Sequence, residues 1–229
     1  MSSLPEHGFW SRLSSFLFPK VYDRRRSKLS GELEVRYEQG RYVLNSPKAN
    51  YSFGSLQDVF AETFAEFELP DRDIDSALIL GFGAGSVAEL LLEAGHTKTI
   101  LVGVEKDRTV LEIATEYFDL AQYRHLELHE ADAVEHLKTE DRQFDLVVVD
   151  VFVDLEVPGS LETPQFVQRL AQVLETDGLL IFNRMYASRL QKVRTHEFIE
   201  VMEIFFPKVI QYRIRDNLML VVDRYEALG

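Results

Sequence analysis

Apolar and polar positions follow two patterns along the chain, one typical of strands and one typical of helices. From residue 77 onward, short apolar runs rich in Val, Ile and Leu alternate with segments whose apolar positions recur every three to four residues. The runs that predict strands are 77–82, 98–105, 125–130, 144–152, 177–183, 208–214 and 217–223. The segments that predict helices are 86–95, 107–118, 132–138, 163–176 and 189–205. This alternation predicts an α/β fold with a doubly wound, mainly parallel, seven-stranded sheet.

The region before this sheet has a pattern that predicts a small β-hairpin region followed by one helix. Residues 33–37 alternate between apolar and charged side chains, and Gln39-Gly40 suits a hairpin turn. Residues 49–55 are expected to add a third strand. Residues 55–69 carry an apolar stripe at helical spacing and predict a helix that is buried on one side.

The first 30 residues are expected to form an appendage. An apolar stripe between residues 9 and 17 predicts a short helix, packed either on its own domain or against another subunit. The run DRRRSK at 23–28 predicts a solvated, cationic connector, with a contact to acidic partners as the alternative. We therefore predict three parts: the appendage at 1–30, the hairpin region with its helix at 31–70, and the large α/β domain at 71–229.

Composition narrows the function classes. The chain has 229 residues and a formal net charge of −13, which disfavours a nucleic-acid binder because such a protein needs a basic face. It has no cysteine, so a disulfide framework or a thiolate nucleophile is excluded. No run of about 18 apolar residues is present, so no membrane-spanning helix is expected. These features fit a cytoplasmic protein that binds neither nucleic acid nor membrane.

A glycine-rich loop follows the first strand of the predicted sheet. Gly81, Gly83 and Gly85 allow tight turns and let a ligand approach the backbone, and free N–H groups of the next helix lie beside them. The pattern is G-x-G-x-G, whereas a dinucleotide loop needs a glycine at the sixth position, which is Ser86 here. No phosphate-loop lysine follows, so a nucleoside triphosphate is disfavoured.

Three acidic residues lie at the carboxyl ends of successive predicted strands. Glu105 ends the second strand and is placed to accept both hydroxyl groups of a ribose, and Asp132 follows the third and is placed either to accept from an adenine amino group or to cap the next helix. Asp150 lies at the end of the fourth strand, at the centre of the expected cleft. Together the three carboxylates favour an adenosine-containing ligand without a pyrophosphate.

Several segments of the chain, the glycine loop among them, resemble those of a known family. Residues from about 31 to 183 resemble the spermidine synthase group of the class I S-adenosylmethionine-dependent transferases, through LILGFGAGSVAELL, VGVEKD, EADAVEHL, FDLVVVDVFVD and ETPQFVQRLAQVLETDGLLIFN. The resemblance implies a Rossmann-like methyltransferase fold. It also implies S-adenosylmethionine or decarboxylated S-adenosylmethionine as the ligand, with methylthioadenosine as a product of the latter. The cofactor-binding positions it implies are Gly81, Gly83, Gly85, Glu105, Lys106, Asp132 and Ala133.

The resemblance also implies a catalytic base, Asp150, with Tyr51 as its partner. Two departures bear on the reaction. The group's glycine loop carries an Asp that receives the ammonium of an aminopropyl donor, and this chain has Ala84 there. The group's carboxylate pair after the fourth strand keeps Asp150 here, but its second member is Val153. A polyamine needs opposed carboxylates to offset desolvation.

Several functions therefore stay open. The first is transfer of an aminopropyl or methyl group to a small-molecule acceptor, of which a polyamine is one example. The alternative is a non-catalytic homologue that only binds the nucleoside. A nicotinamide oxidoreductase is disfavoured by Ser86. The sequence shows no metal-ligand cluster, and its six scattered histidines are expected to be structural. The apolar N-terminal segment and the hairpins favour a homodimer.

Overall fold

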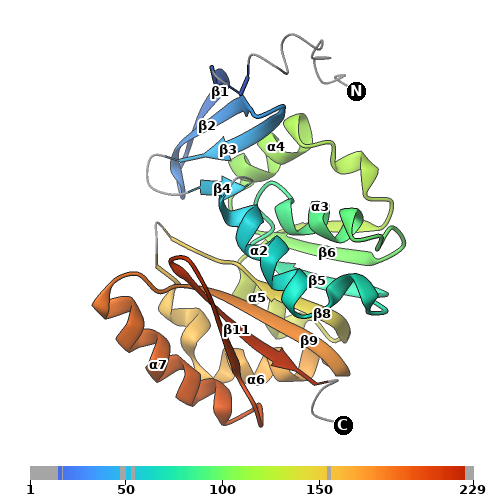
Figure 1. Ribbon diagram of the computed structural model, residues 1–229, viewed down its shortest axis with the longest axis vertical. Coiled ribbons are helices and arrows are strands. Elements are labelled where there is room, and N and C mark those ends of the chain that lie inside the picture. The colour runs from blue at the N-terminus through green and yellow to red at the C-terminus, as the bar shows by residue number, and fades with distance from the viewer. Residues whose placement is uncertain (1–14, 17, 47–49, 53–54, 154–155, 225–229) are drawn as a thin grey trace.

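The computed structural model describes residues 15–16, 18–46, 50–52, 55–153 and 156–224 (Figure 1). None of the described helices is long and apolar enough to cross a membrane. The predicted helix between residues 9 and 17 lies almost wholly outside the described residues.

A small antiparallel sheet forms the N-terminal end of the molecule. Its strands, in spatial order, are β1 (Lys20–Ser27), β2 (Gly31–Glu38), β3 (Arg41–Asn45) and β4 (Asn50–Ser52). The predicted turn is confirmed: Gln39 and Gly40 join β2 to β3 with positive φ angles of 51° and 79°. The cationic connector prediction is wrong, because the run that begins at Asp23 lies in β1 and pairs with β2. β1 is the edge strand of the small sheet, and its three consecutive arginines suit a strand with a solvated edge.

The large sheet has seven strands in the order β10-β11-β9-β8-β5-β6-β7. Their bounds are β5 (Ser76–Leu80), β6 (Ile100–Glu105), β7 (Leu126–Glu130), β8 (Phe144–Val149), β9 (Leu174–Met185), β10 (Ile210–Ile214) and β11 (Asn217–Asp223). Strands β5 to β9 are parallel, and β10 and β11 are antiparallel additions at one edge. The predicted doubly wound, mainly parallel sheet is confirmed.

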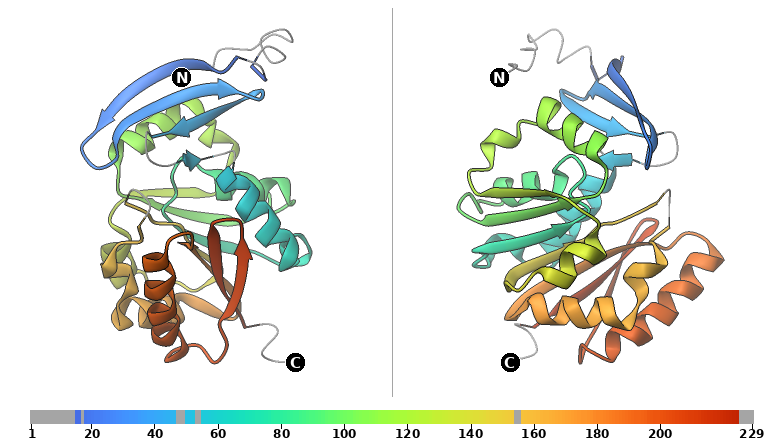
Figure 2. Two further views of the ribbon diagram at one scale, coloured as in Figure 1. Left: turned by 60° about the vertical axis from the view of Figure 1, so that its left-hand side comes forward. Right: turned by 180° about the vertical axis from the view of Figure 1, so that it is seen from behind.

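Helices cover both faces of the large sheet (Figure 2). The helices are α2 (Ser55–Glu66), α3 (Ser86–Glu93), α4 (Arg108–Tyr117), α5 (Ala133–Thr139), α6 (Pro164–Val173) and α7 (Arg189–Glu203). Helices α5, α6 and α7 share one buried apolar cluster with the sheet, and α2 and α3 share another on the opposite face. The predicted helix at 163–176 ends earlier than expected, because residues from Leu174 onward already pair with β8 as part of β9.

The small sheet packs on α4 and thereby reaches the large domain. A third apolar cluster joins Leu33 and Val35 of β2 to Ile113 of α4. At the β1–β2 turn, the hydroxyls of Ser27 and Ser30 both donate hydrogen bonds to Asp107, the residue that caps α4. The domain boundaries at residues 30 and 70 stay a prediction. Pairing of β1 with β2 crosses the first, and packing of α2 on the large sheet crosses the second.

Candidate active site

The carboxyl ends of the parallel strands meet at one edge of the large sheet and surround a cavity of about 530 Å³. That volume lies in the range of small-molecule sites, about 300–1,000 Å³. Seven of the nine predicted site residues line it: Gly81, Gly83, Glu105, Lys106, Asp132, Ala133 and Asp150. Gly85 does not line the cavity but begins α3 with a φ of 97°. Tyr51 belongs to β4, and its side chain lies outside what the structure describes.

Gly81 brings the loop after β5 against the end of β8. Its φ is 86°, and a Cβ atom there would lie 2.2 Å from the carbonyl oxygen of Asp150. Its N–H donates to the carbonyl of Val104 at the end of β6, at 2.9 Å. Only glycine therefore allows the loop to sit between β6 and β8, which opens the cavity above the strand ends.

Glu105 ties the glycine loop to the next crossover. One carboxylate oxygen accepts from the Gly83 N–H at 3.0 Å, and the other accepts from the Asp107 N–H at 2.9 Å. Burial raises the pKa of Glu105, although these backbone donors act in the opposite direction. A carboxylate has further lone pairs, so both oxygens can still accept from hydroxyl groups of a ligand in the cavity.

Asp132 caps the helix that follows it, which is the second of its two predicted roles. Its Oδ1 caps α5 by accepting from the N–H groups of Val134 and Glu135, at 2.9 and 3.3 Å. Its Oδ2 accepts from Lys106 Nζ at 3.0 Å. Partial burial acts to raise the pKa of Asp132, but the Lys106 ammonium and the two backbone donors outweigh it and lower the pKa. The cap does not exclude the adenine role, because Asp132 and Ala133 still line the cavity.

Asp150 stands in the middle of the cavity wall, directly after β8. Its Oδ1 accepts from Asn183 Nδ2 at 2.9 Å, and Asn183 Oδ1 in turn accepts from Asn217 Nδ2 at 2.8 Å. Asn183 is fully buried on β9, and Asn217 begins β11. Burial raises the pKa of Asp150 to about 7, the Asn183 hydrogen bond acts to lower it, and the negative charge of Glu105 adds to the rise.

Sequence reasoning missed Asn183 and Asn217. The signal for Asn183 was present, since it is a polar residue at the end of an otherwise apolar predicted strand, next along the chain after Asp150's strand. Asn217 had no such signal, because it follows a charged hairpin turn where polar residues are ordinary. Only the pairing of β11 with β9 brings its side chain to Asn183.

Ala84 and Val153, the two departures from the family pattern, have different surroundings. Ala84 is 1% exposed and belongs to the apolar cluster between the small sheet and α4, so it does not line the cavity. Val153 is 60% exposed and does line the cavity. Neither position offers a carboxylate to a cationic ligand.

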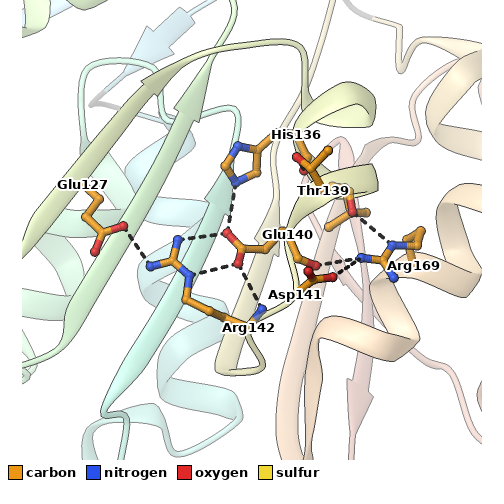
Figure 3. A network of polar contacts seen from close by, with 8 residues as sticks. Glu127, His136, Thr139, Glu140, Asp141, Arg142 and Arg169 are labelled. Atoms are coloured by element: carbon orange, nitrogen blue, oxygen red, sulfur yellow. Dashed lines mark hydrogen bonds and ion pairs between the residues drawn. The ribbon is translucent and has the colours of Figure 1, made fainter.

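A polar network anchors α5, the helix that carries Asp132 (Figure 3). Glu140, just after α5, accepts from Arg142 Nε and Nη2, both at 2.9 Å, and Arg142 also donates to Glu127 of β7 at 2.8 Å. Hydrogen bonding to Arg142 lowers the pKa of Glu140 to about 2. Arg169 of α6 donates to the Glu140 carbonyl at 2.7 Å. The network joins β7, α5 and α6 behind the cavity.

His129 and His136 pack against each other beside this network, with ring centroids 4.9 Å apart. His136 Nε2 lies 3.4 Å from a Glu140 oxygen. Burial lowers the pKa of His136, and the neighbouring His129 lowers it further. Neither histidine lines the cavity, and their position fits the structural role expected for them.

Comparison with known proteins extends this picture. Residues 77–178 match a family described as a methyltransferase domain. The chain is 28% identical over 163 residues to an eEF1A lysine and N-terminal methyltransferase homolog of Drosophila melanogaster, covering 67% of this chain and 24% of that protein. It is 28% identical over 192 residues to a probable polyamine aminopropyl transferase of Bifidobacterium longum, covering 80% of this chain and 40% of that protein. The chain thus spans less than half the length of these curated relatives.

Solved structures of two kinds share the fold. A probable spermidine synthase from Corynebacterium glutamicum superposes with a TM-score of 0.70 at 17% identity, covering 89% of this chain and 79% of that one. Human methyltransferase-like protein 13 in complex with SAH gives 0.60 at 21% identity, covering 75% and 82%. A spermidine synthase in complex with the transition state analogue AdoDATO gives 0.63 at 16% identity, covering 90% and 74%.

The match to the methyltransferase domain begins at Ala77 in β5 and includes the glycine loop described above. The predicted resemblance to the spermidine synthase group is confirmed, and methyltransferases of the same fold match as well. Residues 77–178 thus match a methyltransferase domain, the fold is that of the class I S-adenosylmethionine-dependent methyltransferases, and the chain is similar to spermidine synthases within that fold.

Proposed function

We propose that this chain transfers a methyl group from S-adenosylmethionine to an amine nitrogen, with Asp150 as the base. The observation that carries the proposal is the arrangement at Asp150. Its carboxyl lines the cavity, has a pKa of about 7, and is held through one oxygen by the buried Asn183. A base with a pKa near the working pH combines a usable ionised fraction with enough basicity to accept a proton.

The cavity fits the nucleoside on its β5–β7 side. The glycine loop gives the close backbone approach that a Cβ would block, and Glu105 has acceptor capacity left for the ribose hydroxyls. Asp132 and Ala133 lie where the adenine would be held, and Lys106 lies beside Asp132. When bound, the sulfonium nucleoside would supply an electrophilic carbon, whose bond to sulfur breaks with the electron pair left on sulfur as the new N–C bond forms.

The chain's own contribution to the reaction is alignment and proton removal. Asp150 is placed to accept a proton from the attacking nitrogen, so that the nitrogen lone pair is free to attack. Asn183 occupies Oδ1, which leaves Oδ2 for the amine. Transfer of this kind needs mainly close and correctly oriented reactants, which a cavity lined by backbone and fixed side chains provides. Tyr51 as a partner of Asp150 stays a prediction.

Aminopropyl transfer is the second candidate. The likeness to spermidine synthases favours it, because it extends over the small sheet as well as the large domain. Ala84 and Val153 favour methyl transfer, because one is buried in an apolar cluster and the other places an apolar side chain in the cavity. The ammonium of decarboxylated S-adenosylmethionine would have neither a carboxylate of its own nor one from these two positions, whereas the ammonium of S-adenosylmethionine lies beside its own carboxylate. No observation on the described residues favours the non-catalytic alternative.

Ligand-induced thermal stabilisation tests the proposal. A ligand that binds only the folded state raises the melting temperature, by an amount that grows with the ratio of its concentration to Kd. We expect stabilisation by S-adenosylmethionine and SAH, less by decarboxylated S-adenosylmethionine and methylthioadenosine, and none by NAD. Methyl transfer to amines is then measured with the native chain and with Asp150→Asn, which should bind the nucleoside yet lose turnover.

The outcomes separate the candidates. Stronger stabilisation by decarboxylated S-adenosylmethionine, with transfer to an amine, would replace methyl by aminopropyl transfer. Full activity of Asp150→Asn would remove Asp150 as the base. Binding of the nucleoside without turnover on any amine would favour the non-catalytic alternative. The predicted homodimer and cytoplasmic location stay predictions.

A further inference from the structure

The cavity divides at Asp150 into two halves, because β8 lies between two groups of strands in the sheet order. The ends of β5, β6 and β7 build the half that suits the nucleoside. The other half is built by the segment after β8, the end of β9, the turn between β10 and β11, and Val59 from α2. This second half is where an acceptor amine must lie to reach Asp150.

The acceptor half is mainly apolar. Its apolar lining residues are Val59, Val151, Phe152, Val153, Pro158, Leu161 and Met185, and polar residues line it at Ser160, Asn183 and the β10–β11 turn. The apolar residues come from α2, from the segment after β8 and from β9, so apolar side chains face the space from several directions. Such a surface favours an apolar body next to the reacting nitrogen and gives nothing to a second charge.

The carboxylates near this half already have cationic partners among the described residues. Glu162 forms ion pairs with Arg184 and Arg194, the latter at 2.8 Å. Glu156 pairs with Arg194 at 3.1 Å. These acids hold the segment after β8 against β9 and α7. Both carboxylates form ion pairs with neighbouring arginines, and neither residue lines the cavity.

The β10–β11 turn adds one cation and one anion at the rim. Arg215 lines the cavity and forms an ion pair of 3.3 Å with Asp58 of α2. Asp216 also lines the cavity, but it is exposed to solvent, where its charge is screened. Asp150 is thus the one carboxylate in the described part of the acceptor half that stands beside the reacting position and has no cationic partner.

From this arrangement we infer that the acceptor is an amine with an uncharged, apolar body, not a polyamine. The inference rests on the function proposed above and names its substrate class. A monoamine can place its nitrogen at Asp150 and its apolar body against Phe152 and Leu161. The second ammonium of a diamine would have to leave water against apolar side chains, where the described residues of this half offer it only the exposed carboxylate of Asp216 at the rim, which is unfavourable.

Matched ligands of one length test the inference. Butylamine, putrescine and 4-aminobutyrate differ only in the far end, which is a methyl, an ammonium or a carboxylate group. Their binding is measured by titration calorimetry on the full chain saturated with SAH or methylthioadenosine, whichever it binds. We expect butylamine to bind about tenfold or more tightly than either charged ligand. Putrescine or 4-aminobutyrate binding as tightly as butylamine, or no binding of butylamine, would overturn the inference.

A carboxylate introduced at Val153 provides a second, independent test of the inference. Val153 is 60% exposed, so Val153→Asp should fold, and it places a carboxylate at the acceptor half. We expect it to raise putrescine affinity about two- to fivefold, the range of an exposed ion pair, and to leave butylamine unchanged or weaker. Val193→Asp is the matched control, because Val193 of α7 is 47% exposed and does not line the cavity.

Equal effects of both Asp variants on putrescine would overturn the inference, because they would show a general charge effect. Asp154 lies outside the described residues, so Asp154→Asn is included; a native preference for putrescine that this variant removes would also overturn it. Binding is read without turnover. The expected ranking of the three ligand affinities can therefore be wrong even if the chain transfers a methyl group. The ranking can also be correct even if no transfer is found.

Discussion

Asn183 sets the basicity of Asp150, and its replacement by leucine should move the pH dependence of the reaction. Leucine has a similar shape and no polar atom, so Asn183→Leu removes the 2.9 Å hydrogen bond to Asp150 without opening a cavity. A hydrogen bond to a charged group is worth about 1.5–3 kcal/mol. One pKa unit is about 1.4 kcal/mol, so the pKa of Asp150 should rise from about 7 by about one to two units.

The consequence for the rate follows from the ionised fraction of Asp150. At pH 7 that fraction falls from about one half to between about one tenth and one hundredth, so the rate should fall about five- to fiftyfold. The loss should shrink as the pH rises, because the base ionises fully above its new pKa. The assay is kcat/KM for methyl transfer between pH 6 and 10, with native and variant chains compared at each pH.

A variant rate that is lower by the same factor at every pH would refute the reasoning, since it would show that Asn183 supports the fold and not the base. Urea unfolding of the variant checks that its stability is retained. Asn217→Ala removes only the outer donor to Asn183 Oδ1, at 2.8 Å, and should shift the profile in the same direction by less.

Three other substitutions, with Gly95→Ala as the control for one of them, test separate parts of the structure. Asp150 has a pKa of about 7 when folded and about 3.9 when unfolded. Asp150→Asn should therefore stabilise the chain by up to about 4 kcal/mol above pH 7, a gain that fades towards pH 4; equal gains at pH 8 and pH 4 in urea unfolding would contradict this. Gly81→Ala should lower both stability and nucleoside affinity, because its Cβ would meet the Asp150 backbone. Gly95→Ala has a similar positive φ with open space around it and should cost only the backbone strain, about 1–2 kcal/mol. Ala84→Asp would bury a carboxylate in an apolar cluster and should cost about 3 kcal/mol or more in thermal unfolding; unchanged stability with tighter binding of decarboxylated S-adenosylmethionine would contradict this and favour aminopropyl transfer.

Most strands and helices of the fold could be predicted from local patterns in the sequence. Buried parallel strands read as continuous apolar runs, and helix starts such as Asp107 and Thr163 bear the side chains that cap them, so both could be recognised without the structure. The strand β1 could not, because four consecutive charged residues, from Asp23 to Arg26, give no alternation between its two faces. Its partner β2 alternates between apolar and charged residues and was recognised.

The candidate site likewise contains some residues that the sequence could place there and others that it could not. Gly81, Glu105 and Asp150 each follow a strand along the chain, so the parallel order of the strands was enough to bring them together. Asn217 and Arg215 reach the cavity through an antiparallel pair at the sheet edge, and no local pattern fixes where such a pair turns. Ala84 was expected to face the ligand, and its burial depends on the small sheet packing over the glycine loop.

The β1–β2 turn places part of the small sheet in the wall of the cavity. Leu29 and Ser30 line the cavity, and Ser27 and Ser30 hold Asp107, two residues from Glu105. A ligand that contacts this wall and the small sheet that supplies it must stabilise each other, by thermodynamic reciprocity. Nucleoside binding should then slow amide hydrogen exchange in β1 and β2, and exchange there that is unaffected by a saturating nucleoside would show that the two are uncoupled. The small sheet would in that sense report, from outside the large domain, whether the nucleoside is bound.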